Sequence, residues 1–156
     1  MDAFRRGARL GIDVGKARVG VARSDPDGML AVPVETVPRD DRSIARIAEI
    51  AAEFSPLEIV VGLPLNMRGE DTLSTTDARE FAAAVREALP DIGVRLVDER
   101  LSTVTAHTAL RQSGRSQKKS RGVVDQVAAV VFLQHAVDTE KRTGRAPGAV
   151  LGPSEE

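Results

Sequence analysis

Apolar residues alternate with polar or small residues through the first part of the chain, which is typical of β-strands. Residues 8 to 14 and 19 to 23 form two such runs, and the short glycine-containing stretch between them predicts a tight hairpin. A third strand is expected over residues 31 to 37. Asp40 or Ser43 then begins a helix, because the apolar residues that follow recur at helical spacing until a serine-proline pair ends the pattern.

Strands and helices alternate in the middle of the chain. Residues 59 to 63 are continuously apolar, as expected of a central strand that is covered on both faces. A polar loop over residues 65 to 73 precedes a helix that begins at Ser74 or Thr75, and residues 94 to 97 form the next strand. These elements predict strands that are joined by helical crossovers and therefore run parallel.

The last third of the chain is mainly helical in pattern. A short helix is expected over residues 103 to 112 and a longer one over residues 122 to 138, separated by a polar, basic stretch at 112 to 121. The tail, residues 141 to 156, has too little periodic apolar content to pack, so we expect it to be disordered. The chain then forms one domain over residues 1 to 140.

The order of elements predicts an α/β fold with a mixed five-stranded sheet. An antiparallel meander forms one side of this sheet, parallel crossovers form the other, and helices cover both faces. Ligands of such sheets gather at the carboxyl ends of the parallel strands. Glu99 follows the last predicted strand directly and lies at such an end.

Composition narrows the possible functions. The chain has 156 residues, of which 42% are hydrophobic, enough for one full core, and a net charge of −1 that creates no overall field for an anion. Aromatic residues are 3% and all are Phe, which argues against a single-strand binder that stacks bases on aromatic rings. The absence of cysteine excludes thiolate metal sites and cysteine nucleophiles. His107 and His135 have no partners at ligand spacing, and we assign them no function.

Neither a signal-peptide pattern nor a membrane-length apolar run occurs in the sequence. We therefore expect a soluble, cytoplasmic protein with no membrane partner.

The first predicted strand carries a carboxylate between two glycines. Alternation places Asp13 on one face together with Gly11 and Gly15, and the other face carries the apolar side chains. Because glycine leaves that face bare, a phosphate or a cation can approach the carboxylate closely. Asp13 is therefore a candidate metal ligand, although an aspartate after a strand also caps turns in many folds.

Two further acidic positions lie far downstream. The strand at 94 to 97 ends in Asp98 and Glu99, which face opposite sides of the sheet, so alternation alone leaves open which of them points at a metal. Asp125 shares one stripe of the last predicted helix with alanines that let the helix press against the sheet. Three clustered carboxylates repel one another unless a cation neutralises them, and Mg²⁺ and Mn²⁺ prefer such oxygen ligands. The alternative interpretation of Asp125 is a carboxylate favoured by the helix dipole.

Positive charge is concentrated just before Asp125. Arg111, Arg115, Lys118, Lys119 and Arg121 lie in a stretch that contains no acid. Such a segment could contact phosphates beside bound metal ions, or it could be an ordinary solvated loop. The candidate nucleic-acid contacts are Lys16, Arg18, Arg100, Arg115, Lys118, Lys119 and Arg121.

Four motifs in the expected order resemble the YqgF (RuvX) family over roughly residues 8 to 140. They are GIDVG with RVGVA at 11–15 and 18–22, VGLPLN at 61–66, VDERLST at 97–103, and DQVAA at 125–129. The resemblance implies a ribonuclease-H-like fold related to Holliday-junction resolvases, and a nuclease that processes the 5′ end of the small-subunit rRNA precursor. It further implies that Asp13, Glu99 and Asp125 are the catalytic and metal-binding acids, with Mg²⁺ or Mn²⁺ as cofactor, and that the basic segment faces nucleic acid.

Several functions remain compatible with this pattern. The first is a metal-dependent nuclease acting on structured RNA such as precursor rRNA, and the second is a resolvase of branched DNA, which would need the paired active sites of a homodimer. A third is a nucleic-acid-binding module of the same fold without catalysis. A nucleotide-binding protein of the actin and sugar-kinase type also begins with a similar strand, but it needs two such domains and the chain has length for one.

Overall fold

The computed structural model describes residues 4–99 and 117–151, and in the second range it describes side chains from residue 126 onward. The elements in chain order are β1 (Arg9–Val14), β2 (Arg18–Ser24), β3 (Ala31–Pro38), α1 (Ser43–Phe54), β4 (Glu58–Leu63), α2 (Leu73–Ala88), β5 (Gly93–Asp98), α4 (Gln117–Thr143) and β6 (Ala149–Leu151). The expected helix at 103 to 112 lies outside the described residues.

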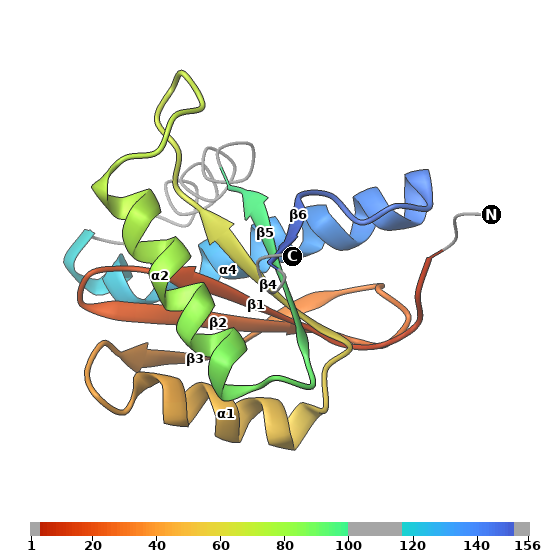
Figure 1. The fold of residues 1–156 in the computed structure, drawn as a ribbon, viewed down its shortest axis with the longest axis horizontal. Coiled ribbons are helices and arrows are strands. Elements are labelled where there is room, and N and C mark those ends of the chain that lie inside the picture. The colour runs from red at the N-terminus through yellow and green to blue at the C-terminus, as the bar shows by residue number, and fades with distance from the viewer. Residues whose placement is uncertain (1–3, 100–116, 152–156) are drawn as a thin grey trace.

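A single mixed sheet organises the fold, with its strands in the order β3-β2-β1-β4-β5-β6 (Figure 1). The strands β1, β2 and β3 form an antiparallel meander, whereas β4 lies parallel to β1 and β5 lies parallel to β4. The mixed α/β architecture predicted from the sequence is therefore confirmed. The sheet has six strands among the described residues rather than the expected five, because β6 adds to β5 in the antiparallel sense.

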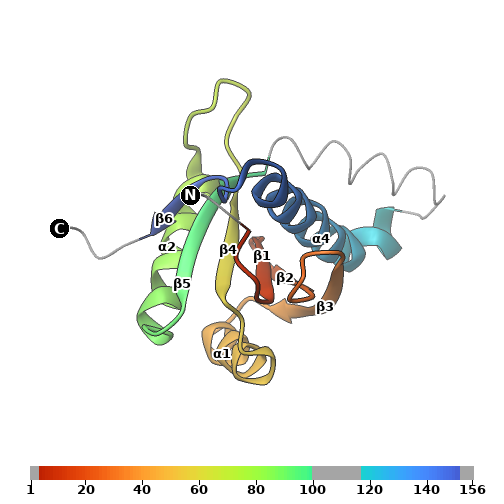
Figure 2. The same ribbon diagram turned by 90° about the vertical axis from the view of Figure 1, so that its right-hand side faces the viewer.

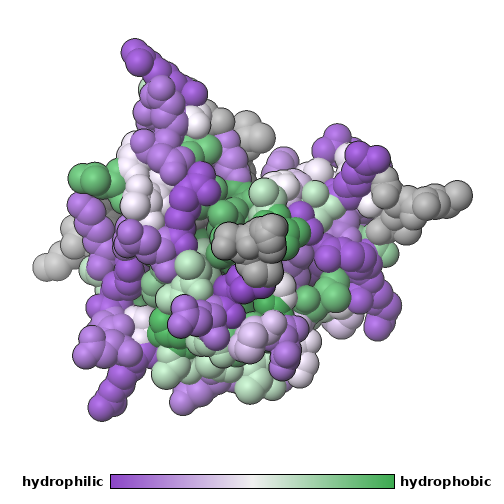
Figure 3. Space-filling model, in the orientation of Figure 1, coloured by the Kyte–Doolittle hydropathy of each residue, from purple (hydrophilic) through white to green (hydrophobic). Residues whose placement is uncertain are grey.

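Helices cover both faces of the sheet, α4 on one and α1 with α2 on the other (Figure 2). Leu10 and Ile12 of β1 point toward α1 and α2 and belong to the larger apolar core. Val60 and Val97 point the other way and pack with Phe132 of α4 in a second, smaller core. The outer face of α1 and α2 is hydrophilic over much of its area, with separate apolar patches (Figure 3). None of the helices that the structure describes is long and apolar enough to cross a membrane.

Two expectations about the C-terminal part of the chain are wrong. The stretch expected to be a polar loop becomes helical at Gln117, because glutamine, lysine and arginine are good helix formers, and the helix continues through Gly122. The tail expected to be disordered from residue 141 instead completes α4 and then forms β6. In β6, the Leu151 carbonyl accepts a hydrogen bond of 2.7 Å from Arg86 Nε, and Leu151 packs against the larger core. Residues 152 to 156 lie outside the described residues.

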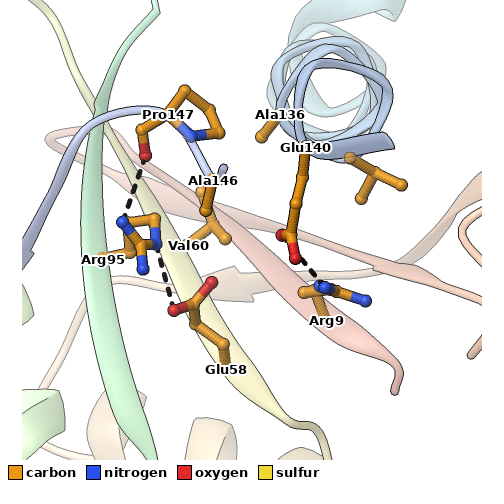
Figure 4. A pocket seen from close by; sticks show the side chains of 9 residues that line it. Arg9, Glu58, Val60, Arg95, Ala136, Glu140, Ala146 and Pro147 are labelled. Atoms are coloured by element: carbon orange, nitrogen blue, oxygen red, sulfur yellow. Dashed lines mark hydrogen bonds and ion pairs between the residues drawn. The ribbon is translucent and has the colours of Figure 1, made fainter. Parts of the chain in front are cut away.

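An ion-pair cluster around two buried carboxylates joins the amino-terminal ends of β1 and β4 to the end of α4 (Figure 4). Glu140 accepts from Arg9 Nη2 at 3.0 Å and from Arg5 Nε at 2.9 Å. Arg95 Nε lies 3.0 Å from Glu58, which also pairs with Arg5 at 3.1 Å. Burial alone would raise the pKa of Glu140, but hydrogen bonds from Arg5 and the charge of Arg9 outweigh it and lower that pKa to about 2. The cluster thus fastens the end of the sheet opposite the predicted carboxylate site.

Candidate active site

Asp13 lies on the face of the sheet that α4 covers, as alternation along β1 predicts. Gly11, on the same face, lies directly under the helix: a Cβ there would come within 3.0 Å of Leu133 Cβ and 3.2 Å of the Ala129 carbonyl oxygen. A larger residue here would force α4 to shift by a few tenths of an ångström. Asp13 lies two residues farther along the strand and is half-buried.

Glu99 reaches the same face from the end of β5. Its backbone N–H donates to the Leu63 carbonyl at 3.2 Å, which keeps the chain beside β4 for one residue beyond the strand. Its carboxylate lies over Gly62, where an added Cβ would overlap Glu99 Oε2 and approach the Phe132 ring to 2.8 Å. Glu99 Oε2 is inaccessible to solvent. Gly62 therefore provides the space in which the Glu99 carboxylate is held.

The carboxyl groups of Asp13 and Glu99 are hydrogen-bonded to each other. Burial is the main cause that raises the pKa of Glu99, and the negative charge of Asp98 raises it further, while the hydrogen bond with Asp13 acts in the opposite direction. A proton shared between the two groups, or a cation, relieves their repulsion. Sequence alternation left open whether Asp98 or Glu99 faces Asp13, and it is Glu99 that makes the contact.

The backbone of α4 passes over the same region just after Asp125. Gln126 Nε2 donates to Thr36 Oγ1 at 2.7 Å. Thr36 is the cross-strand partner of Gly20, and Gly20 is the partner of Asp13, so the three positions form one row across the sheet. The helix therefore crosses the Asp13 row at Gln126. The Asp125 side chain lies outside the described side chains, so its convergence with Asp13 stays a prediction.

The predicted cations lie in the hairpin after β1, in the first turns of α4, and outside the described residues. Lys16 is exposed in the hairpin between β1 and β2, and Arg18 at the start of β2 is half-buried. Lys118, Lys119 and Arg121 belong to the first turns of α4, although their side chains are outside the described set. Arg100 and Arg115 lie outside the described residues.

The two carboxylates suit a hard divalent cation. Asp13 and Glu99 supply only oxygen donors, and their contact brings together two acids that repel when both are ionised. Among the side chains that the structure describes, no group of three or more His, Cys, Asp or Glu could hold a metal ion. A complete set of ligands therefore needs a contribution from elsewhere, and Asp125 is the predicted source.

Two structural features near the site were not predicted from the sequence. Gly62 interrupts the apolar run of β4, and a lone glycine in a central strand is the available signal of a close approach by another group. Arg39, which follows β3, binds both Asp77 of α2 and the Gly15 carbonyl of the hairpin. Nothing in the local sequence around Arg39 identifies this contact.

Comparison with known proteins identifies close relatives. A protein from Clavibacter sepedonicus named "Putative pre-16S rRNA nuclease" is 57% identical over 151 residues, covering 95% of this chain and 93% of that protein. One of the same name from Streptomyces coelicolor is 49% identical over 147 residues, covering 93% of this chain and 88% of that protein. Among solved structures, Thermus thermophilus RuvC in complex with a Holliday junction substrate shares the fold, with a TM-score of 0.57 and 20% identity over 90% of this chain and 98% of that one.

A family model agrees with these relatives. The model described as "RuvX: Holliday junction resolvase" matches residues 7–139, which span both the described carboxylate pair and the helix that carries Asp125. The chain therefore belongs to the RuvX family.

Proposed function

We propose that this protein is a divalent-metal-dependent nuclease that hydrolyses phosphodiester bonds in structured nucleic acid, with the 5′ end of precursor 16S rRNA as its substrate. The observation that carries the proposal is the contact between the carboxyls of Asp13 and Glu99, which come from strands far apart in sequence. Membership of the RuvX family and the names of the relatives support the nuclease activity and the rRNA substrate.

The metal site in this proposal consists of Asp13, Glu99 and Asp125, which would hold Mg²⁺ or Mn²⁺. When bound, such an ion supplies Lewis acidity and positive charge for phosphodiester hydrolysis. The chain itself holds Glu99 Oε2 in a solvent-inaccessible position over Gly62 and brings the Glu99 carboxyl against Asp13. The fold thus holds the two carboxylates together before a cation binds, and the repulsion between them favours binding of a cation.

Substrate phosphates would be held by the cations around this site. Lys16 is exposed on the hairpin that follows Asp13, and Arg18 lies at the other end of that hairpin. Lys118, Lys119 and Arg121 are in the first turns of α4, shortly before the helix crosses the Asp13 row. We propose that these residues, together with Arg100 and Arg115, contact the nucleic-acid backbone without reading its sequence.

A second candidate function is resolution of Holliday junctions. It is favoured by the description of the family model and by the likeness of the fold to RuvC. The chemistry at the carboxylates would be the same, but two active sites would have to act together in a homodimer. Cleavage of a four-way DNA junction by a dimer, with no cleavage of precursor rRNA, would favour this function over the first.

The test compares cleavage of a 5′-extended 16S rRNA fragment in Mg²⁺ by the natural protein, by Asp13→Asn and by Asp91→Asn. Asp91 is exposed in the turn before β5 and serves as the matched control. We expect Asp13→Asn to lower the rate by more than roughly 100-fold. Loss of an outer partner of a metal ligand costs up to about 100-fold, and loss of a ligand itself should cost more. Undiminished cleavage by a folded Asp13→Asn protein would refute the proposal, as would a natural protein that binds this RNA without cutting it.

A further inference from the structure

Arg39 and Asp77 form an ion pair beside the hairpin that follows Asp13. We propose that Arg39 is a positioning residue of the active site: anchored by Asp77, it fixes the hairpin at residues 15 to 18 and, through β1, the orientation of the Asp13 carboxylate. This inference rests on the proposed function of Asp13. It assigns to α2 a role in catalysis that its distance in sequence from the acids does not suggest.

The contacts of Arg39 are directed at both ends of the hairpin. Its Nη1 donates to the Gly15 carbonyl at 2.9 Å and to Asp77 Oδ2 at 2.9 Å, and its Nη2 donates to Asp77 Oδ1 at 2.7 Å. Its backbone N–H donates to the Ala17 carbonyl at 2.9 Å. One residue thus binds two backbone carbonyls of the hairpin and is itself held by a bidentate carboxylate, an arrangement with little rotational freedom.

The hairpin transmits this constraint to Asp13 because it is short and closed. The Gly15 N–H donates to the Arg18 carbonyl at 2.9 Å, and a Cβ on Gly15 would lie 2.7 Å from that oxygen, so the turn needs glycine. Both polar groups of the Gly15 backbone are therefore engaged, one within the hairpin and one by Arg39. Asp13 lies two residues before Gly15 and is paired with Gly20 on β2. A rotation of the turn would rotate the strand end that carries Asp13.

Asp77 is suited to act as the anchor. The hydrogen bonds from Arg39 lower its pKa, against a smaller opposing effect of burial, and the positive charges of Arg39 and Lys16 lower it further. Asp77 therefore remains ionised at neutral pH and also attracts Lys16, the exposed cation of the hairpin. The Arg39 guanidinium lies over the Phe81 ring at 4.9 Å from its centroid, which fixes its plane from the side of α2.

A second arginine–aspartate pair on the same helix provides a comparison. Arg79 donates to Asp71 through Nε at 2.7 Å and through Nη2 at 3.1 Å, so the chemistry of the pair resembles that of Arg39 with Asp77. The hydrogen bonds of Arg79 with Asp71 stay within α2 and the loop before it, whereas those of Arg39 reach the hairpin. A purely stabilising role would make the two pairs equivalent in their effect on catalysis. A positioning role would not.

The experiment uses three single-substitution variants of the full chain: Arg39→Lys, Asp77→Asn and, as the control, Arg79→Lys. Lysine keeps the charge of Arg39 but cannot bind Asp77 and Gly15 together with a planar fork. We expect Arg39→Lys and Asp77→Asn to lower kcat for RNA cleavage roughly tenfold and to weaken Mn²⁺ binding by a similar factor, the lower end for outer-shell partners of metal ligands. KM for RNA should change far less, and Arg79→Lys should leave kcat and Mn²⁺ affinity unchanged. Mn²⁺ binding is measured by titration without RNA.

Three results would overturn the inference. One is an Arg39→Lys protein with the same kcat and Mn²⁺ affinity as Arg79→Lys. Another is a loss of activity that only follows the folded fraction measured by circular dichroism. The third is full activity of Asp13→Asn, which would refute the proposed function as well. An inactive Asp13→Asn protein together with an unaffected Arg39→Lys protein would refute only the role of Arg39.

Discussion

Replacing Gly62 by alanine should separate Glu99 from Asp13 while leaving both acids in the chain. The added Cβ would overlap Glu99 Oε2 and lie 2.8 Å from Cε2 and 3.2 Å from Cδ2 of the Phe132 ring. Phe132 is 1% exposed and belongs to the core under α4, so it has little room to move. Glu99 is attached beyond the end of β5 and is the group that can yield. We therefore expect its carboxylate to move away from Asp13.

The size of the effect follows from this geometry. Glu99 Oε2 has to retreat by about 1 Å to reach an ordinary van der Waals distance, and a misplacement of about 1 Å at a catalytic group can cost on the order of 100-fold in rate. Packing an extra methyl group against Phe132 should also lower the free energy of unfolding by about 1–3 kcal/mol. Activity should thus fall by much more than the loss of folded protein explains.

The matched control is Gly93→Ala at the start of β5, where an added Cβ meets nothing within 4 Å. Both variants are compared with the natural protein for RNA cleavage in Mg²⁺, for Mn²⁺ affinity and for unfolding in urea. We expect a large loss of rate and of Mn²⁺ affinity for Gly62→Ala and almost none for Gly93→Ala. Equal rates for the two variants would show that the position of Glu99 over Gly62 does not matter for the reaction.

Three further predictions concern stability, each measured by urea unfolding. The ion pairs with Arg5 and Arg9 lower the pKa of Glu140 from 4.5 to about 2, which stabilises the fold by about 3 kcal/mol above pH 4.5. This contribution disappears as the pH falls through 2. Glu140→Gln should therefore lower the free energy of unfolding at pH 7 and lower it progressively less in acid. Thr72→Ala removes the side chain that accepts from the Thr75 N–H at the start of α2 and should cost about 1 kcal/mol. Truncation after Gly148 removes β6 and should cost roughly 2–3 kcal/mol through lost strand hydrogen bonds and the packing of Leu151. A Glu140→Gln deficit independent of pH, or no change in either other variant, would contradict the corresponding contact.

The sequence predicted the face of Asp13 correctly because alternation in a strand depends only on local geometry. It could not choose between Asp98 and Glu99, because alternation stops being a guide where the strand ends. The choice depends on Gly62, which belongs to a neighbouring strand and leaves space for the Glu99 carboxylate. This space beside Gly62 can be recognised only when the register of β4 and β5 is known.

The missed elements have a similar cause. The strand β6 is three residues long and has no periodic pattern of its own, but β5 offers it an exposed edge with free backbone groups. Tertiary pairing thus overrides a composition that favours disorder. The contact of Arg39 with Gly15 joins the end of β3 to the hairpin between β1 and β2. The pattern of charges along the sequence does not indicate this contact.

The central claim is that Asp13, Glu99 and Asp125 hold one divalent-metal site. A crystal of the natural protein soaked in Mn²⁺ tests it directly through the anomalous difference map. We predict a Mn²⁺ peak with oxygen ligands from all three side chains, and loss of that peak in crystals of Asp13→Asn. Asp125 directed away from the Asp13–Glu99 pair, with no Mn²⁺ bound there at saturating concentration, would contradict the claim.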